Sequence, residues 1–276
     1  MKFPRHFFQS QVASPSPSQI ASIIDAACCD VLVLDADFII STAAQNQLDH
    51  VANRIRTVNP DAYVFAYISP ADYQSYQSDF VCRLKLGFDP EWLVRSVGDK
   101  KPIALFQAPD GTSSYLMNLT MPAFREHLLK TICSFPALTS PHMTGIYLDW
   151  GCEVGWIVDK KKPDGTPFVP GGVDLFNNGV PTPKDVMDEA WKAGWNDLAR
   201  QLAGPPGRVV VGNCGWQGNP GFVASGMMVE GFMAGGAIQP GTWGSWSQVM
   251  KNYAYYSGAG VWLPMSWIQH NCSLLG

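Results

Sequence analysis

The chain has 276 residues, of which 46% are hydrophobic and 15% are charged, so it can bury a large core and lacks the composition of a disordered protein. Its formal net charge of -4, without a basic stripe, gives no electrostatic footprint for nucleic acid. Seven cysteines without a CxxC spacing argue against a disulfide framework and a zinc site.

Targeting and membrane signals are absent from the sequence as given. Residues 1–11 lack the long apolar segment of a signal peptide, and no run of ~20 apolar residues could form a membrane span. We therefore expect a soluble chain that does not contact a membrane. Its compartment and its oligomeric state stay open, and an extracellular or virion-associated role is compatible with these observations.

Short apolar runs that read as buried strands begin near the N-terminus. Three are predicted in the first quarter of the chain: residues 5–11, which end in Gln9-Ser10-Gln11, residues 30–37 and residues 63–68. Between them, apolar residues at helical spacing predict a helix capped by Ser18 and a second helix over residues 48–58.

A long segment follows the third strand. The stretch from about Ala71 to Met121 exceeds a normal loop, and insertions of this length at the upper rim of a barrel usually shape a substrate cleft. A helix is predicted to begin at Pro122. The fourth strand then lies within residues 144–151, where Gly145 provides a sharp turn into an apolar run that ends in an acid and a tryptophan.

Residues 152–181 form a second long segment, rich in Gly, Pro, Asp and Asn, which is either a lid over the site or a decorated loop. Thr182 as cap and Pro183 as first residue predict a helix. Trp191 and Trp195 share one face of that helix, and we expect them in the core rather than in contact with a ligand.

The last third of the chain predicts strands over residues 208–213, 226–232 and 260–265, with a helix over 245–255. No eighth strand is evident, so either the chain is cut short or its final residues supply an irregular closing strand. The alternation of strands and helices predicts a single α/β domain over residues 1–276. Its expected architecture is a (β/α)8 TIM-type barrel with long loops after strands three and four.

Two carboxylates stand at the ends of predicted buried strands. Asp149 and Glu230 each follow an apolar run and precede a break in the strand, where an unpaired acid in a core would be expensive to desolvate. At the upper face of a barrel the same acids form an active site. Polar and aromatic residues near the same strand ends are candidates for substrate binding, namely Gln9, Asp35, Tyr67, Trp150, Asn213, Trp216 and Trp262.

Two of these candidates have alternatives. Asp35 could instead stabilise a turn by bonds from its side chain to the backbone, as we expect Asp37 to do. Trp150 could pack beneath Asp149 or flank a sugar ring.

Other chemistries lack their motifs. The sequence has no GxGxxG after a strand, no GxxxxGK[ST] and no GxSxG, and its five histidines are scattered, which disfavours nucleotide, serine-hydrolase and zinc sites. Glycoside hydrolysis is the leading chemistry for two carboxylates: one protonates the leaving oxygen, and the other attacks the anomeric carbon or activates water. We predict no cofactor, no metal, and a polysaccharide or oligosaccharide substrate.

Several segments, taken in order and spacing, resemble the glycoside hydrolases related to the endo-α-1,4-polygalactosaminidase barrels. They are Trp92-Leu93, residues 117–125, residues 145–149, Gly212-Asn213 and residues 230–232, within a similarity that runs from about residue 5 to residue 265. The resemblance implies a (β/α)8 barrel and a retaining reaction, with Asp149 as nucleophile and Glu230 as acid/base. This chain departs from the family at Trp150, where a small polar residue often follows the acid, and at its C-terminus, which lacks the expected closing segment.

The sequence therefore predicts a hydrolase of glycosidic bonds in a polysaccharide. The alternative from a different class is a barrel without turnover, which binds carbohydrate or serves a structural role in a larger surface or virion assembly.

Overall fold

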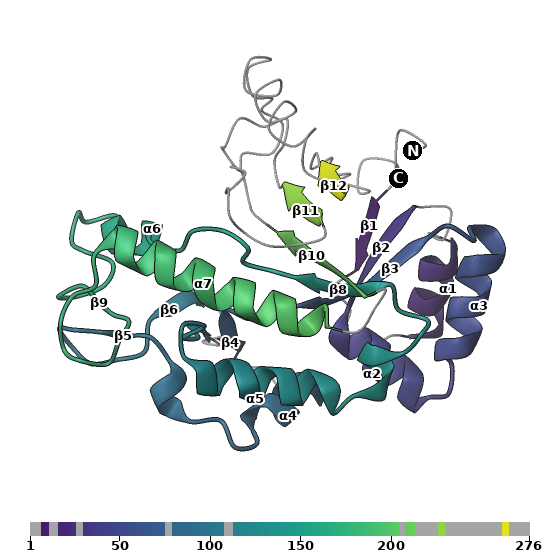
Figure 1. The fold of residues 1–276 in the computed structure, drawn as a ribbon, viewed down its shortest axis with the longest axis horizontal. Helices are drawn as coiled ribbons and strands as arrows, with labels where there is room; N and C mark the ends of the chain where they lie inside the picture. The colour runs from purple at the N-terminus through teal and green to yellow at the C-terminus, as the bar shows by residue number, and fades with distance from the viewer. Residues whose placement is uncertain are drawn as a thin grey trace, which may run out of the picture.

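The computed structural model describes residues 7–10, 16–25, 30–74, 79–107, 113–204, 208–213, 226–229 and 261–264. Its centre is a seven-stranded sheet in the order β1-β2-β3-β8-β10-β11-β12, in which every neighbouring pair is parallel (Figure 1). The strands are β1 (Phe7–Ser10), β2 (Val31–Asp35), β3 (Tyr63–Ile68), β8 (Gly145–Leu148), β10 (Val209–Asn213), β11 (Gly226–Val229) and β12 (Val261–Pro264). All seven predicted strands are confirmed.

The sheet is open in the part of the chain that the structure describes. Strands β1 and β12 each pair with one neighbour, and within the described ranges no strand joins them. The closed ring of eight strands and the single domain over residues 1–276 therefore stay predictions. The helix expected over residues 245–255 lies outside the described residues.

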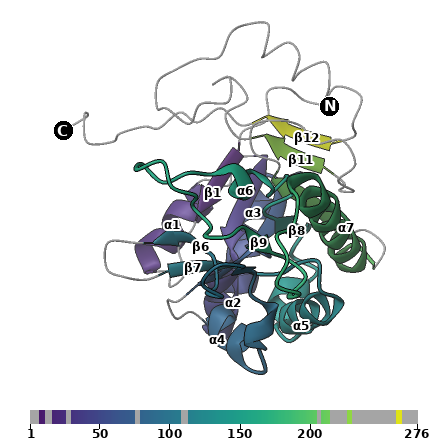
Figure 2. The ribbon, with the colours of Figure 1, turned by 90° about the vertical axis from the view of Figure 1, so that its left-hand side faces the viewer.

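Five longer helices accompany the sheet within the described residues: α1 (Pro17–Asp25), α2 (Ala36–Ala44), α3 (Leu48–Val58), α5 (Pro122–Cys133) and α7 (Lys184–Leu202), with the short η3 (Pro136–Thr139) after α5. In both ribbon views α2 and α5 lie together at the bottom, far from strands β11 and β12 at the top (Figures 1 and 2). Apolar side chains of all five helices share one core cluster with one face of the strands, including Leu34, Ala66 and Leu148.

The start of α1 corrects one prediction. The helix begins at Pro17, and the hydroxyl of Ser16 rather than Ser18 accepts a hydrogen bond from the Gln19 backbone N–H at 3.3 Å. The Gln19 side chain accepts from the Ser16 N–H at 2.7 Å, which completes a capping box. Proline favours the first helical position, and this preference places the cap one residue earlier, at Ser16.

Helix α2 was not predicted, and the predicted strand 30–37 ends earlier, at Asp35. Residues 36–40 and Thr42 are all buried, so α2 has no polar stripe that would reveal a helical period. Gly145 is required for a different reason from the sharp turn that we expected. A Cβ atom there would lie 1.8 Å from the carbonyl oxygen of Val209 on the neighbouring strand.

The two long segments are folded and joined to each other. The first contains β4 (Asp72–Gln74), α4 (Asp79–Lys85), η2 (Pro90–Trp92), β5 (Arg95–Ser96), β6 (Ala104–Gln107) and β7 (Ser113–Leu116), of which β4, β7 and β6 form an antiparallel sheet. The second contains α6 (Trp156–Asp159) and β9 (Val173–Asp174). Strand β9 pairs with β5, so the second segment is tied to the first rather than hanging as an independent lid.

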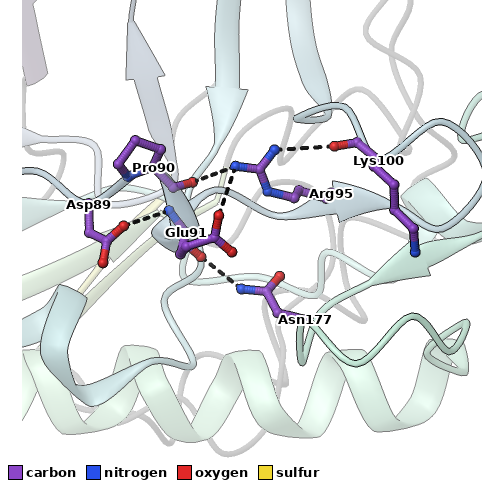
Figure 3. A network of polar contacts seen from close by, with 6 residues as sticks. All are labelled: Asp89, Pro90, Glu91, Arg95, Lys100 and Asn177. Atoms are coloured by element: carbon purple, nitrogen blue, oxygen red, sulfur yellow. Dashed lines mark hydrogen bonds and ion pairs between the residues drawn. The ribbon is translucent and has the colours of Figure 1, made fainter.

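Side chains reinforce this junction (Figure 3). Arg95 donates to the carbonyl oxygens of Pro90 and Lys100 and pairs with the Glu91 carboxylate at 3.4 Å. Asn177, from the second segment, donates to the Glu91 carbonyl at 2.9 Å. We refer to the two joined segments as the rim, because they leave the sheet after the carboxyl ends of β3 and β8.

Candidate active site

The register of the sheet places four of the predicted site residues on one face. Val31, Val33, Phe65, Tyr147 and Val211 form a second apolar cluster, separate from the core beneath the helices. Successive side chains of a strand alternate between faces, so every second residue continues this surface. Asp35, Tyr67, Asp149 and Asn213 are the residues that continue it at the carboxyl ends of β2, β3, β8 and β10. We call this surface the inner face.

Asp149 is the centre of a hydrogen-bonded group on the inner face. Its Oδ2 accepts from the Tyr67 hydroxyl at 2.5 Å, and its Oδ1 accepts from the Asn213 amide at 2.9 Å and from the Trp150 backbone N–H at 2.8 Å. Three donors stabilise negative charge on a carboxylate and fix its orientation. Of the predicted site, the structure thus brings Asp149, Tyr67 and Asn213 into direct contact.

Tyr67 serves this group as a permanent donor. Burial raises the pKa of Tyr67 well above its usual value, and the negative charges of Asp149 and Asp72 raise it further. A phenol in this state stays protonated and donates to the carboxylate instead of acting as a nucleophile. Asp72, on β4, was not predicted as a site residue. It is placed there by pairing of β4 with β7, where Ser114 donates to its Oδ2 at 3.0 Å.

Asp35 lies on the same face, but it is bound differently. Its Oδ1 accepts from the backbone N–H of Asp37 at 2.8 Å, so that it caps α2. Burial raises the pKa of Asp35 to about 6, although the bonds to the backbone oppose that shift. The local bond expected of Asp37 is therefore made by Asp35, while the Asp37 side chain accepts from the more distant Phe80 N–H at 2.8 Å.

Trp150 follows Asp149 in a left-handed backbone conformation, with φ of +58°. Its partly buried ring packs against the core cluster beneath the helices. A role for this ring beside a sugar stays a prediction. Trp191 and Trp195 are fully buried, as expected, but their indole N–H groups also bind the backbone carbonyls of Trp150 and Asp149. Hydrophobic spacing could not reveal this second role.

The remaining predicted residues are placed by backbone register or not at all. Gln9 pairs with Val33, which is itself on the inner face, and so stands one step below Asp35. Trp262 pairs with Met227, which pairs with Gly212, so its register position differs from that of Asn213. Glu230 and Trp216 lie outside the described residues, although Glu230 is the first residue after β11.

The described part of the chain contains neither a cluster of metal ligands nor a helix that could span a membrane. Among those residues, no group of three or more His, Cys, Asp and Glu side chains could hold a metal ion. No helix in the same residues is sufficiently long and apolar to cross a bilayer.

No family model and no curated protein sequence matches the chain. Solved structures do resemble it. A cycloisomaltooligosaccharide glucanotransferase from Paenibacillus, complexed with cycloisomaltoheptaose, is 13% identical with a TM-score of 0.55, over 96% of this chain and 38% of that one. A trehalose-6-phosphate hydrolase from Bacillus licheniformis is 11% identical with a TM-score of 0.51, over 94% and 56%. A cycloalternan-forming enzyme from Listeria monocytogenes, in complex with a pentasaccharide substrate, is 13% identical with a TM-score of 0.50, over 94% and 25%.

These similarities concern the fold. The chain spans between a quarter and just over half of the length of these three structures. At such low identity the likeness does not identify catalytic residues. The chain has the α/β fold with a parallel sheet that is found in TIM-barrel glycoside hydrolases.

Proposed function

We propose that the protein hydrolyses glycosidic bonds, with Asp149 and Glu230 as its two reacting carboxylates. The observation that carries the proposal is the group around Asp149. A carboxylate at the carboxyl end of a parallel strand accepts three hydrogen bonds from the inner face and its own turn. Enzymes built on parallel α/β sheets, in TIM barrels and in open sheets, place their reacting groups at the carboxyl ends of the strands.

The spacing of the strands supports the pairing with Glu230. Strand β10 separates β8 from β11, and neighbouring strands lie about 4.8 Å apart, so the ends of β8 and β11 are separated by roughly 10 Å of backbone. Carboxyl groups that act together on a glycosidic bond are about 5 to 10 Å apart. Carboxylate side chains at two such strand ends can therefore lie at the distance of a retaining enzyme, about 5 Å, or at that of an inverting enzyme, about 10 Å.

In the proposed reaction, Asp149 attacks the anomeric carbon while Glu230 donates its proton to the glycosidic oxygen, and the bond from carbon to that oxygen breaks. Glu230 then takes a proton from water, whose oxygen attacks the anomeric carbon and releases Asp149. Tyr67 and Asn213 hold the Asp149 carboxylate throughout. This retaining course follows the resemblance to polygalactosaminidase-related enzymes, and an inverting course would use the same two acids with a wider separation.

The substrate class also belongs to the proposal. Two of the similar structures contain a cyclic oligosaccharide or a pentasaccharide. The rim, which leaves the sheet on the side of Asp149, would contribute contacts with a longer saccharide. The nonenzymatic alternative, a barrel that only binds carbohydrate, is compatible with the same contacts, because a carboxylate that accepts three hydrogen bonds can also serve only to stabilise the fold.

A screen of the purified protein against a panel of polysaccharides, read by release of reducing ends, distinguishes hydrolysis from binding alone. The proposal predicts release by the wild type and loss of nearly all release in Asp149→Asn and Glu230→Gln. Asp188→Asn is the matched control, because Asp188 is also buried and accepts a backbone N–H, from Gly155 at 2.6 Å, but lies on α7. Binding of a polysaccharide without any release would favour the alternative, and full release by either acid variant would refute the proposed pair.

A further inference from the structure

The turn that carries Asp149 is strained and is held from outside. Trp150 has a φ of +58°, in the left-handed region that residues other than glycine, asparagine and aspartate rarely adopt. Such a conformation persists only when surrounding contacts determine it. In this turn the Trp150 N–H points back to the Asp149 carboxylate at 2.8 Å, so the path of the backbone and the direction of the carboxylate are coupled.

Two indole N–H groups from α7 provide those outside contacts. Trp195 Nε1 donates to the carbonyl oxygen of Asp149 at 3.0 Å, and Trp191 Nε1 donates to the carbonyl oxygen of Trp150 at 3.2 Å. Both side chains are fully buried. Residues four apart lie above one another on a helix, so α7 presents two donors to two successive peptide groups.

Helix α7 is itself packed closely against the residues just before α5. A Cβ atom at Gly194 would lie 2.2 Å from the Leu119 carbonyl oxygen, so the helix backbone approaches to a distance that only glycine permits. Arg125 binds the same carbonyl at 3.0 Å and pairs with Asp197 of α7 at 2.8 Å. The two indoles therefore extend from a rigid support.

We infer that Trp191 and Trp195 are positioning residues for Asp149: their indole N–H groups hold the left-handed turn that directs the carboxylate to the inner face. This inference rests on the proposed function for its catalytic consequence, but the turn itself can be examined without any substrate. Burial of a tryptophan N–H requires some partner, and here both partners are the peptide carbonyls next to the proposed nucleophile.

Trp195→Phe and Trp191→Phe keep an aromatic ring and remove the N–H. We expect kcat to fall about tenfold to a hundredfold, because small displacements of a reacting group have effects of that size, while KM changes less than about twofold. Phe124→Leu is the control for lost aromatic packing, since the buried Phe124 ring on α5 packs against Phe88 and Trp92 with ring centroids 6.1 and 6.0 Å apart and does not contact the turn through a hydrogen bond. An unchanged kcat for the folded Trp195→Phe protein would overturn the inference.

A crystal structure of Trp195→Phe gives the second readout, which does not depend on turnover. We expect Trp150 to leave the left-handed region and Asp149 to lose its bond with Tyr67 or Asn213; a turn identical to that of the wild type would overturn the inference. If Trp195→Phe fails to fold, benzothienylalanine at position 195 replaces only the indole N–H by sulfur and permits both measurements. A wild type that is inactive on every polysaccharide would count against the proposed function, and the structural comparison would still decide the role of the indoles.

Discussion

Replacing Asp35 by asparagine should stabilise the protein at pH 8 and leave its stability almost unchanged at pH 4. Burial raises the pKa of Asp35 from its ordinary 3.8 to about 6, so the folded protein binds this proton more tightly than the unfolded chain. The stabilisation that comes from the bound proton is fully present below pH 3.8 and is lost as the pH rises through 6. Above that range the ionised side chain opposes folding.

The size of the effect follows from the same shift. A difference of about two pKa units corresponds to ~3 kcal/mol, and water in contact with this partly buried side chain reduces it to a range of about 1 to 3 kcal/mol. Asparagine accepts the hydrogen bond from the α2 N-terminus as aspartate does, so the cap is kept. For a chain of this size, we expect Asp35→Asn to raise Tm at pH 8 by roughly 3 to 10 °C.

The assay is thermal unfolding of both proteins by circular dichroism between pH 4 and pH 8. Asp164→Asn provides the control, because Thr166 donates two hydrogen bonds that lower the pKa of the exposed Asp164, so this side chain titrates below the pH range of the assay. Its Tm difference from the wild type should stay nearly constant between pH 4 and pH 8. A Tm difference between Asp35→Asn and the wild type that is independent of pH would refute the reasoning.

Three further substitutions test the site, the sheet and the rim. Tyr67→Phe removes a donor to the Asp149 carboxylate and should lower kcat on the identified polysaccharide by about a hundredfold. An unchanged kcat would show that Tyr67 does not contribute to the reaction. Gly145→Ala forces a methyl group onto the Val209 carbonyl and should reduce the free energy of unfolding by about 3 kcal/mol or more in urea titrations; a loss below 1 kcal/mol would contradict the close approach of β8 and β10. Asn118→Ala removes a buried amide that binds the second rim segment and should speed tryptic cleavage after Lys160 and Lys161, and an unaltered cleavage rate would show that the segment is held by other contacts.

The sequence was most informative for strands that are buried on both faces of the sheet. Strands such as Val31–Asp35 and Gly145–Leu148 are continuous apolar runs because both faces of the parallel sheet are covered, and such runs are visible without an alignment. Since strands in a parallel sheet end at one edge, the acids and amides that follow them could be predicted to share a face. The contacts of Tyr67 and Asn213 with Asp149 agree with that expectation.

Other features depend on contacts that no local pattern contains. Helix α2 is buried almost all round, so its sequence resembles a strand or loop as much as a helix. The rim contains strands of two to four residues, too short to show an alternation, and they are defined by pairing with distant segments. The spacing of Trp191 and Trp195 indicated a core position correctly, but the direction of an indole N–H is fixed only by tertiary packing.

In the proposed reaction, Asp149 and the acid after β11 act on opposite sides of one glycosidic bond. A crystal structure of the Glu230→Gln variant with an oligosaccharide of the polysaccharide identified in the screen would reveal this arrangement. We expect an anomeric carbon about 3 to 3.5 Å from an Asp149 carboxylate oxygen, with the glycosidic oxygen within hydrogen-bonding distance of residue 230. A saccharide bound with its glycosidic bonds remote from both residues would contradict it.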